Sequence, residues 1–220
     1  MPAVTMRFVD AENDQPIAGA HVLFWAKAIE GTFSGHGGKR AYLFLVESVT
    51  SEKGEVHFPA QSFSPRPFRL STTYDNPDMI VFKPGYALAM LTNRRRIIAT
   101  LEDVETWEPN GRTVGMRRVS TGKETNHSIY TAARFAEATY TVGYGHGGAI
   151  CGWKTIPQFL VDLDRAVRAW KRKPPPVEKD DLRQLVSNPL ESLLARGDYY
   201  VAKGCGSPNA FFEPYFRRDH

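Results

Sequence analysis

The residues that could carry chemistry in this sequence gather in one glycine-rich segment, residues 142–151. The segment reads Val-Gly-Tyr-Gly-His-Gly-Gly-Ala-Ile-Cys and places His146 five residues before Cys151. A thiol beside an imidazole can act as a nucleophile with its base, or supply half of a metal site. The other cysteine is Cys205, and the six histidines are scattered along the chain. Residues 142–151 are therefore the first candidate for an active site.

Each enzymatic interpretation of this segment lacks a part that its chemistry needs. A P-loop has Lys-Ser/Thr after its last glycine, and a dinucleotide-binding segment has Gly-x-Gly-x-x-Gly after a strand. Here a predicted helix precedes the segment and Ala-Ile-Cys follows its glycines. His146-Gly-Gly is similar to part of an esterase oxyanion hole, but the chain has no Gly-x-Ser-x-Gly nucleophile. A closed zinc site needs paired ligands, and Cys-x-x-Cys and His-x-x-x-His are absent. We predict no catalytic residue, metal or cofactor.

The two cysteines, Cys151 and Cys205, have three interpretations. In an oxidising compartment a single pair most simply forms one disulfide. The alternatives are two inert buried thiols, or a metal or catalytic role. We predict the disulfide, which would close a loop of about 55 residues and contribute about 4 kcal/mol in the chain-entropy model.

Charge and hydropathy bound the classes of function. The chain has 220 residues, of which 28 are Lys or Arg and 24 are Asp or Glu, giving a net charge of +4. This small excess is not the footprint of a nucleic-acid-binding protein. No apolar run approaches the ~20 residues of a transmembrane helix. The start, Met1-Pro-Ala, lacks the regions of a signal peptide, so we expect either a cytoplasmic chain or one whose leader was trimmed.

The first sixty residues alternate between apolar and polar positions with the period of β-strands. Val4, Met6 and Phe8 share one side of a first strand, and a third strand is expected over residues 42–50. Gly54 then suits a turn that needs positive φ. The second strand has two apolar faces, one formed by Ala20, Val22, Phe24 and Ala26 and the other by Leu23 and Trp25.

The strand pattern continues to about residue 119. The apolar run Met79–Phe82 predicts a central strand covered on both faces, and Pro84-Gly85 predicts a type II turn. Further strands are expected at 88–91 and 113–119. Composition changes near Ser120, which we take as the boundary between a first unit, residues 1–120, and a second, residues 121–220.

Spaced residues in the first unit resemble a known family. The pattern is Asp10, then Pro16-Ile-Ala-Gly-Ala-x-Val22, then Thr50-x-x-x-Gly54-x-x-x-Phe58, and then Lys83-Pro84-Gly85-Tyr86. It is similar to the carboxypeptidase regulatory-like domain over roughly residues 3–104. The resemblance implies a transthyretin-like, seven-stranded β-sandwich that bears no catalytic residue and that supports, presents or binds something. Bacterial proteins of this kind often carry a leader, so we favour a periplasmic or cell-envelope location over a cytoplasmic one.

The second unit has the period of helices. Residues 126–140 form an apolar stripe of Ile129, Ala132, Ala133, Ala136 and Tyr140, with Thr125 or Asn126 expected as N-cap. A second stripe runs from Ile156 to Trp170, with Thr155 as the expected cap. Asn188-Pro189 predicts the start of a short helix and Gly197 its end. Tyr199–Val201 is interpreted as an edge strand or a packing segment, and the aromatic tail 211–216 is expected to lie against the body of the protein.

Two loops and one basic cluster are the candidates for binding. We expect a glycine-rich loop at Ile29–Arg40, an aromatic loop at Gln61–Asn76, and solvated or phosphate-binding arginines at 94–96. His21 and His57 are expected on strand surfaces. The predicted binding residues are His36, Phe63, Phe68, Tyr74, Arg94, Arg95, Arg96, Tyr144 and His146.

The sequence thus predicts an α+β protein, in which an N-terminal, transthyretin-like antiparallel β-sandwich precedes a C-terminal helical module. The predicted function is that of a non-enzymatic binding or structural protein of the bacterial cell envelope, whose partner is a protein or an envelope component. The alternative is a hydrolase or thiol-dependent enzyme with its site at Gly143–Cys151.

Overall fold

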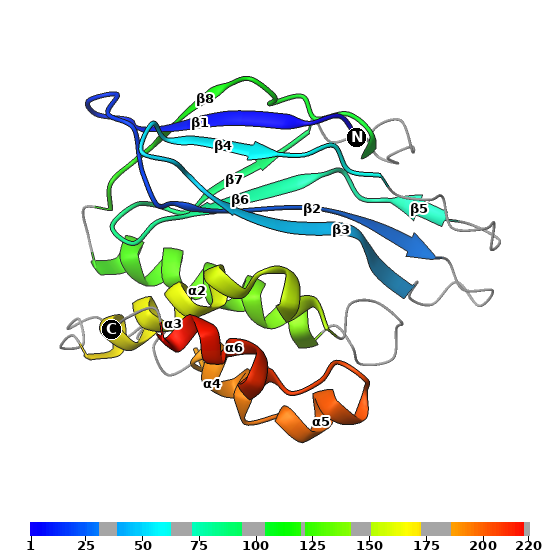
Figure 1. Cartoon of the computed structure of the whole chain (residues 1–220). Helices are drawn as coiled ribbons and strands as arrows, with labels where there is room; N and C mark the ends of the chain where they lie inside the picture. Colours follow the sequence, from blue (N-terminus) through cyan, green and yellow to red (C-terminus); the bar gives the residue numbers. More distant parts are fainter. Residues whose placement is uncertain are drawn as a thin grey trace.

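The computed structural model describes residues 1–30, 39–62, 72–93, 104–119, 122–141, 151–172 and 186–217. Two β-sheets lie one above the other, and a layer of helices covers the outer face of the lower sheet (Figure 1). Strands fill the N-terminal half and helices the C-terminal half. This arrangement confirms the predicted α+β class.

The first sheet has three strands, β1 (Val4–Asp10), β4 (Glu55–Phe58) and β8 (Thr113–Met116), in the order β4-β1-β8. Strand β1 pairs antiparallel with β4 and parallel with β8. The described strand pairs are antiparallel, as predicted, except for the parallel pairing of β8 with β1. Strand β8 follows β7 of the second sheet along the chain. In the first sheet it runs in the same direction as β1.

The second sheet follows the order β3-β2-β6-β7, with β5 paired to β2. All of its pairings are antiparallel. The described residues hold eight strands in all, one more than the family resemblance implied. The five strands of this sheet are β2 (His21–Glu30), β3 (Lys39–Val49), β5 (Thr72–Tyr74), β6 (Asp78–Phe82) and β7 (Ala89–Thr92).

Strand β2 carries buried residues on both faces. Ala20, Val22, Phe24 and Ala26 belong to the core between the sheets, whereas Leu23 and Trp25 belong to the core beneath the helices. Strand β6 divides in the same way, with Met79 and Val81 on one side and Ile80 and Phe82 on the other. A central strand with apolar residues on both faces needs two covering layers, and here the second layer is helical.

The helices pack on the second sheet through continuous apolar stripes. Every described side chain of the two stripes that the sequence predicted is buried, and the C-terminal Phe212 is buried too. The helices are α2 (Gly122–Thr141), the 3-10 helix η1 (Gly152–Thr155), α3 (Pro157–Arg172), α4 (Pro189–Leu194), α5 (Gly197–Ala202) and α6 (Pro208–Phe216).

The N-caps predicted for the two long helices differ in the structure. Helix α2 begins at Gly122, ahead of Asn126, and the Asn126 Oδ1 instead accepts a hydrogen bond from Trp170 Nε1 at 2.6 Å. Thr155 belongs to η1, where its hydroxyl donates to the Gly152 carbonyl at 2.7 Å. Asn126 is taken up by a partner distant in sequence and Thr155 by the turn of η1, and rules for local capping anticipate neither.

The C-terminal prediction is also partly wrong. Gly197 begins α5 instead of ending α4, and the segment Tyr199–Val201 is helical, with Tyr200 buried. Asn188 and Pro189 do stand at the N-cap and first position of α4, as predicted. The buried Trp153 of η1 contacts Tyr200, and α6 also packs against it, so the aromatic tail lies against the protein as expected.

Candidate binding groove beside strand β7

Most of the predicted binding residues lie outside the described part of the chain. Tyr74 is the exception: it stands on β5, is half-buried and packs against the core between the sheets, so it is a packing residue. Strands β2 and β3 continue into the predicted loop Ile29–Arg40 and pair Glu30 with Lys39. The residues outside the described part are His36, Phe63, Phe68, Arg94, Arg95, Arg96, Tyr144 and His146.

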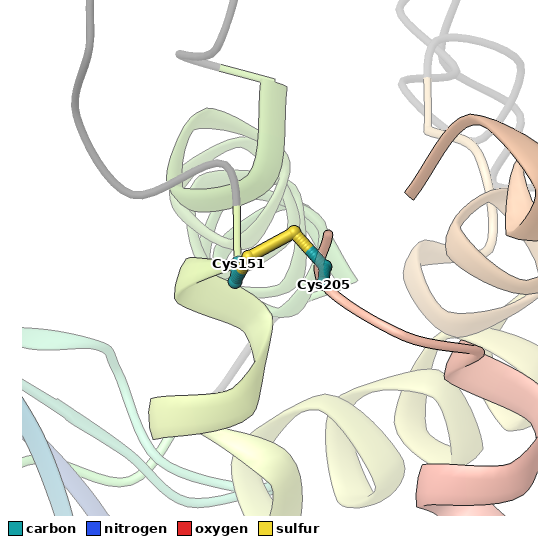
Figure 2. The surroundings of a disulfide bond; sticks show 2 residues. All are labelled: Cys151 and Cys205. Carbon is teal, nitrogen blue, oxygen red and sulfur yellow. A yellow bond between two sulfur atoms is a disulfide. The ribbon is translucent and has the colours of Figure 1, made fainter. Parts of the chain in front are cut away.

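Cys151 and Cys205 form a disulfide with their Cα atoms 5.4 Å apart. The bond joins the start of η1 to the segment between α5 and α6 (Figure 2). Cys205 is buried and Cys151 is half-buried. The pairing is the one predicted from the sequence, and the Cys151 sulfur is not available as a thiolate nucleophile while the bond is intact.

A groove of about 520 Å³ lies between β7 and α2. This volume falls within the roughly 300–1,000 Å³ of ordinary ligand sites. Ala87, Leu88 and Met90, in and just before β7, form one wall. Lys123, His127 and Thr131 stand on the other wall at four-residue intervals, the spacing that aligns side chains along one helix face.

Strand β7 is the last strand in the order of the second sheet, as far as the described residues go. Just before it, the edge is covered: the Ala87 N–H donates to the Arg117 carbonyl at 2.9 Å, and the Val119 N–H donates to the Gly85 carbonyl at 3.0 Å. The Leu88 N–H then donates to Ser128 Oγ at 3.2 Å. The groove begins where this pairing stops.

The groove combines basic groups with one exposed apolar side chain. Met90 is 64% exposed, the largest value among the large hydrophobic residues that the structure describes as exposed. Arg117 pairs with Glu124 across the groove at 2.9 Å. Lys123 and His127 are exposed on α2, and no ion pair links either of them to another described residue. The described lining therefore has an excess of positive charge.

Ser128 also borders a smaller cavity of about 130 Å³ on the other side of α2. Its walls come from the turn at Lys83–Tyr86, from α2 and from α3, so it lies where the sandwich meets the helices. Buried Phe82, Ile129 and Trp170 line it. A space of this size takes at most a ligand of about benzene size.

A polar cluster joins the sheet to the start of α3. His21 on β2 is buried, and its Nε2 lies 2.7 Å from Asp162 Oδ2. Asp162 also accepts from Arg165 Nη1 at 2.6 Å. The hydrogen bond from His21 is the main reason that the pKa of Asp162 is lowered, and Arg165 adds to it. The His21 Nδ1 is buried without a described hydrogen-bond partner. The expectation of a strand-surface His21 is wrong, because α3 covers that face.

Glu47 on β3 completes this junction. Its two carboxylate oxygens accept hydrogen bonds from the backbone N–H groups of Gln158 and Phe159, at 2.9 and 3.0 Å. It thereby caps α3, the role that the sequence assigned to Thr155. Burial raises the pKa of Glu47, although the two N–H groups pull it the other way. The contacts of His21 and Glu47 join α3 to the second sheet, so we assign this cluster a structural role.

A second carboxylate, Asp10, forms a hydrogen-bond network that holds the turn at Lys83–Tyr86. Asp10 is buried at the end of β1 and accepts hydrogen bonds from the Glu12 N–H, Arg118 Nε and the Tyr86 hydroxyl, at 2.9, 2.6 and 2.9 Å. These bonds lower the pKa of Asp10, led by the Glu12 N–H. Asp10 and Tyr86 both belong to the pattern that resembles the carboxypeptidase regulatory-like domain, so here the pattern marks a structural contact.

Sequence reasoning did not find the groove. Its residues come from β7, from the segment after β8 and from the first turns of α2, and no motif links them. The predicted helix, residues 126–140, contained His127 but not Lys123, so the sequence did not show their common face. Within the described residues, no cluster of three or more His, Cys, Asp or Glu side chains could hold a metal ion. Likewise, none of the described helices is long and apolar enough to cross a membrane.

Comparison with known proteins assigns no family. No family model matches the sequence, and no curated protein matches it. Among solved structures, the chain is similar to a 9R-lipoxygenase from Cyanothece PCC8801, with 13% identity and a TM-score of 0.28. The alignment covers 88% of this chain and 30% of the lipoxygenase chain. A likeness at this TM-score carries no argument about fold or activity.

Proposed function

We propose that this chain is a non-enzymatic binding protein of the bacterial cell envelope, in which a sandwich related to the carboxypeptidase regulatory-like domain is the scaffold. The observation that carries the proposal is the Cys151–Cys205 disulfide. Structural disulfides persist in oxidising compartments such as the periplasm and are rare in the cytosol. The same bond removes the thiol on which the thiol-dependent alternative relies.

The distribution of polar groups supports binding over catalysis. The buried carboxylate Asp10 and the half-buried Glu47 are occupied by backbone N–H groups and by neighbouring side chains. Neither residue lines the groove beside β7. That groove offers a strand edge, basic side chains and the exposed Met90, the kind of surface that recognises another chain.

The proposal is tested by free-thiol titration of the denatured protein, purified from its host without reductant. We expect no thiol before reduction and two after it. Two free thiols at once would contradict the envelope location and restore the thiol-dependent alternative. Cell fractionation of the host, with the chain detected by antibody, gives an independent readout of location.

The enzymatic alternative is tested with a panel of esterase, peptidase and glycosidase substrates. We expect no turnover from the oxidised protein. Turnover that is lost in Cys151→Ser and kept in Cys205→Ser would overturn the binding proposal, since only the first substitution removes the candidate nucleophile while both break the disulfide.

A further inference from the structure

We propose that the groove between β7 and α2 binds an extended, acidic segment of a partner protein, which adds to the sheet as a strand beside β7. This inference rests on the proposed binding function and specifies its surface and partner class. Three features of the described residues carry it: the end of the strand order at β7, the charge of the lining and the exposed Met90.

The strand edge provides the backbone contacts. Residues 117–119 run antiparallel to residues 85–87, with an isolated bridge between Tyr86 and Arg118. This pairing stops at Ala87, and β7 starts at Ala89. An incoming segment in extended conformation would continue the ladder along Ala89–Thr92. Strand addition of this kind obtains its affinity from main-chain hydrogen bonds and its specificity from alternate side chains.

The charge of the lining selects an acidic segment. Arg117 and Glu124 neutralise each other, which leaves Lys123 as the excess cation and His127 as a further donor. Both side chains are exposed on the face of α2 that borders the groove. Carboxylates on an incoming segment would meet them, and complementary charge of this kind sets specificity and association rate.

Met90 adds an exposed apolar surface to the basic lining. It stands opposite Ile80 in the β6–β7 register, so its side chain lies on the same face of the sheet as the helices. In an extended chain alternate side chains face the same side. An alternating segment directs one kind of side chain towards α2, and its carboxylates on that side would meet Lys123 and His127 beside Met90.

The test uses three labelled peptides of equal length and fluorescence anisotropy with the oxidised full chain. The first alternates Glu and Val, the second alternates Lys and Val, and the third has the first composition with a central Pro. We expect the Glu peptide to bind at least about tenfold more tightly than either of the others. Equal binding of the Glu and Lys peptides, or of the Pro peptide, would overturn the charge or the strand-addition part.

Substitutions in the lining locate the site. Lys123→Glu and His127→Glu should each weaken binding of the Glu peptide about threefold to fivefold and should raise the affinity for the Lys peptide. Acidic residues in the first turns of a helix are compatible with its dipole, so both variants should fold. The matched control is Lys171→Glu, an exposed lysine on α3 outside the groove. An equal effect of the control would refute the location.

The competing occupant is a second copy of this chain, paired edge to edge through β7. Sedimentation velocity of the oxidised protein tests this outcome, and a dimer that Met90→Lys dissociates would overturn the proposed partner class. If no peptide binds, the groove proposal is refuted and the proposed function is unaffected. The proposed function is refuted by free thiols in the unreduced protein, or by turnover that requires Cys151.

Discussion

Glu47 on β3 caps helix α3 from 112 residues away in sequence: its Oε2 accepts the backbone N–H of Phe159 at 3.0 Å. Its other oxygen accepts the N–H of Gln158 at 2.9 Å. The first N–H groups of a helix have no partner within the helix, so an acceptor from elsewhere must satisfy them. The same contact therefore completes the helix and fixes its start against the second sheet.

We predict that Glu47→Ala lowers the free energy of unfolding by about 1–2 kcal/mol, because it leaves two N–H groups without their acceptor. Glu47→Gln should lose less, since its amide keeps one carbonyl oxygen. Urea denaturation at pH 7 measures both. Glu52→Ala, at an exposed turn position, is the control and should change stability little. Equal stabilities of Glu47→Ala and the control would show that the cap contributes nothing.

The contact between His21 and Asp162 predicts a pH dependence. The pKa of Asp162 is lowered in the folded protein, chiefly by the hydrogen bond from His21. A carboxyl group with a lowered pKa contributes stability above its unfolded pKa of about 3.9, and loses it as the pH falls through the lower folded value. Asp162→Asn should therefore be less stable than the wild type at pH 7, and the difference should shrink as the pH falls below about 4.

Unfolding in urea at several pH values between neutral and strongly acidic measures this difference. The control is Asp198→Asn, which removes the same charge from an exposed position on α5. Glu47 gives stability a pH dependence of the opposite sign. Its folded pKa is raised by burial, so its contribution to stability is lost as the pH rises through that folded pKa. A constant difference between wild type and Asp162→Asn at every pH would contradict the assigned contact.

The disulfide predicts a large effect of reduction on stability. The bond joins residues 54 positions apart, and a loop of this length corresponds to about 4 kcal/mol in the chain-entropy model. Cys151→Ser combined with Cys205→Ser should unfold at a clearly lower urea concentration than the oxidised protein. Reductant should lower the midpoint of the wild type and leave that of the double variant unchanged. A wild-type midpoint that is indifferent to reductant would show that the bond is absent in solution.

The sheets were predictable because their signals are local. Alternating apolar residues placed β1, and the apolar run Met79–Phe82 correctly implied covering layers on both sides of β6. The apolar stripes of α2 and α3 were equally plain. Periodicity reports which residues must be buried, so it also gave the buried faces of the helices.

The parts that could not be predicted depend on partners distant in sequence. The Glu47 cap, the burial of His21 and the parallel pairing of β8 with β1 each require knowing which elements are neighbours. The groove beside β7 is of the same kind, because its lining unites Met90 and its neighbours with Lys123 and His127 on α2. Residue spacing within one segment carries no information about contacts between distant segments. The cysteine pair was predictable because two thiols allow only one intramolecular disulfide.

Gly54 lies in a turn where we expect a side chain to be strongly destabilising. Its φ is +72°, and a Cβ at this position would lie 2.3 Å from the Phe8 carbonyl oxygen. The Phe8 N–H also donates to the Gly54 carbonyl at 2.8 Å, so the backbone cannot move away without breaking the contact between β1 and this turn. Gly54→Ala therefore combines an unfavourable φ with a backbone collision.

Gly85 is the matched control, because its φ is +90° and no atom lies within 4 Å of the Cβ position. We predict that Gly85→Ala lowers the free energy of unfolding by about 1–2 kcal/mol, the cost of a left-handed non-glycine residue. Gly54→Ala should cost about 3 kcal/mol or more, because the collision is added to the same strain. Thermal and urea unfolding of both variants measure this. Equal losses would mean that the turn relaxes freely, and that close packing against Phe8 does not require glycine at position 54.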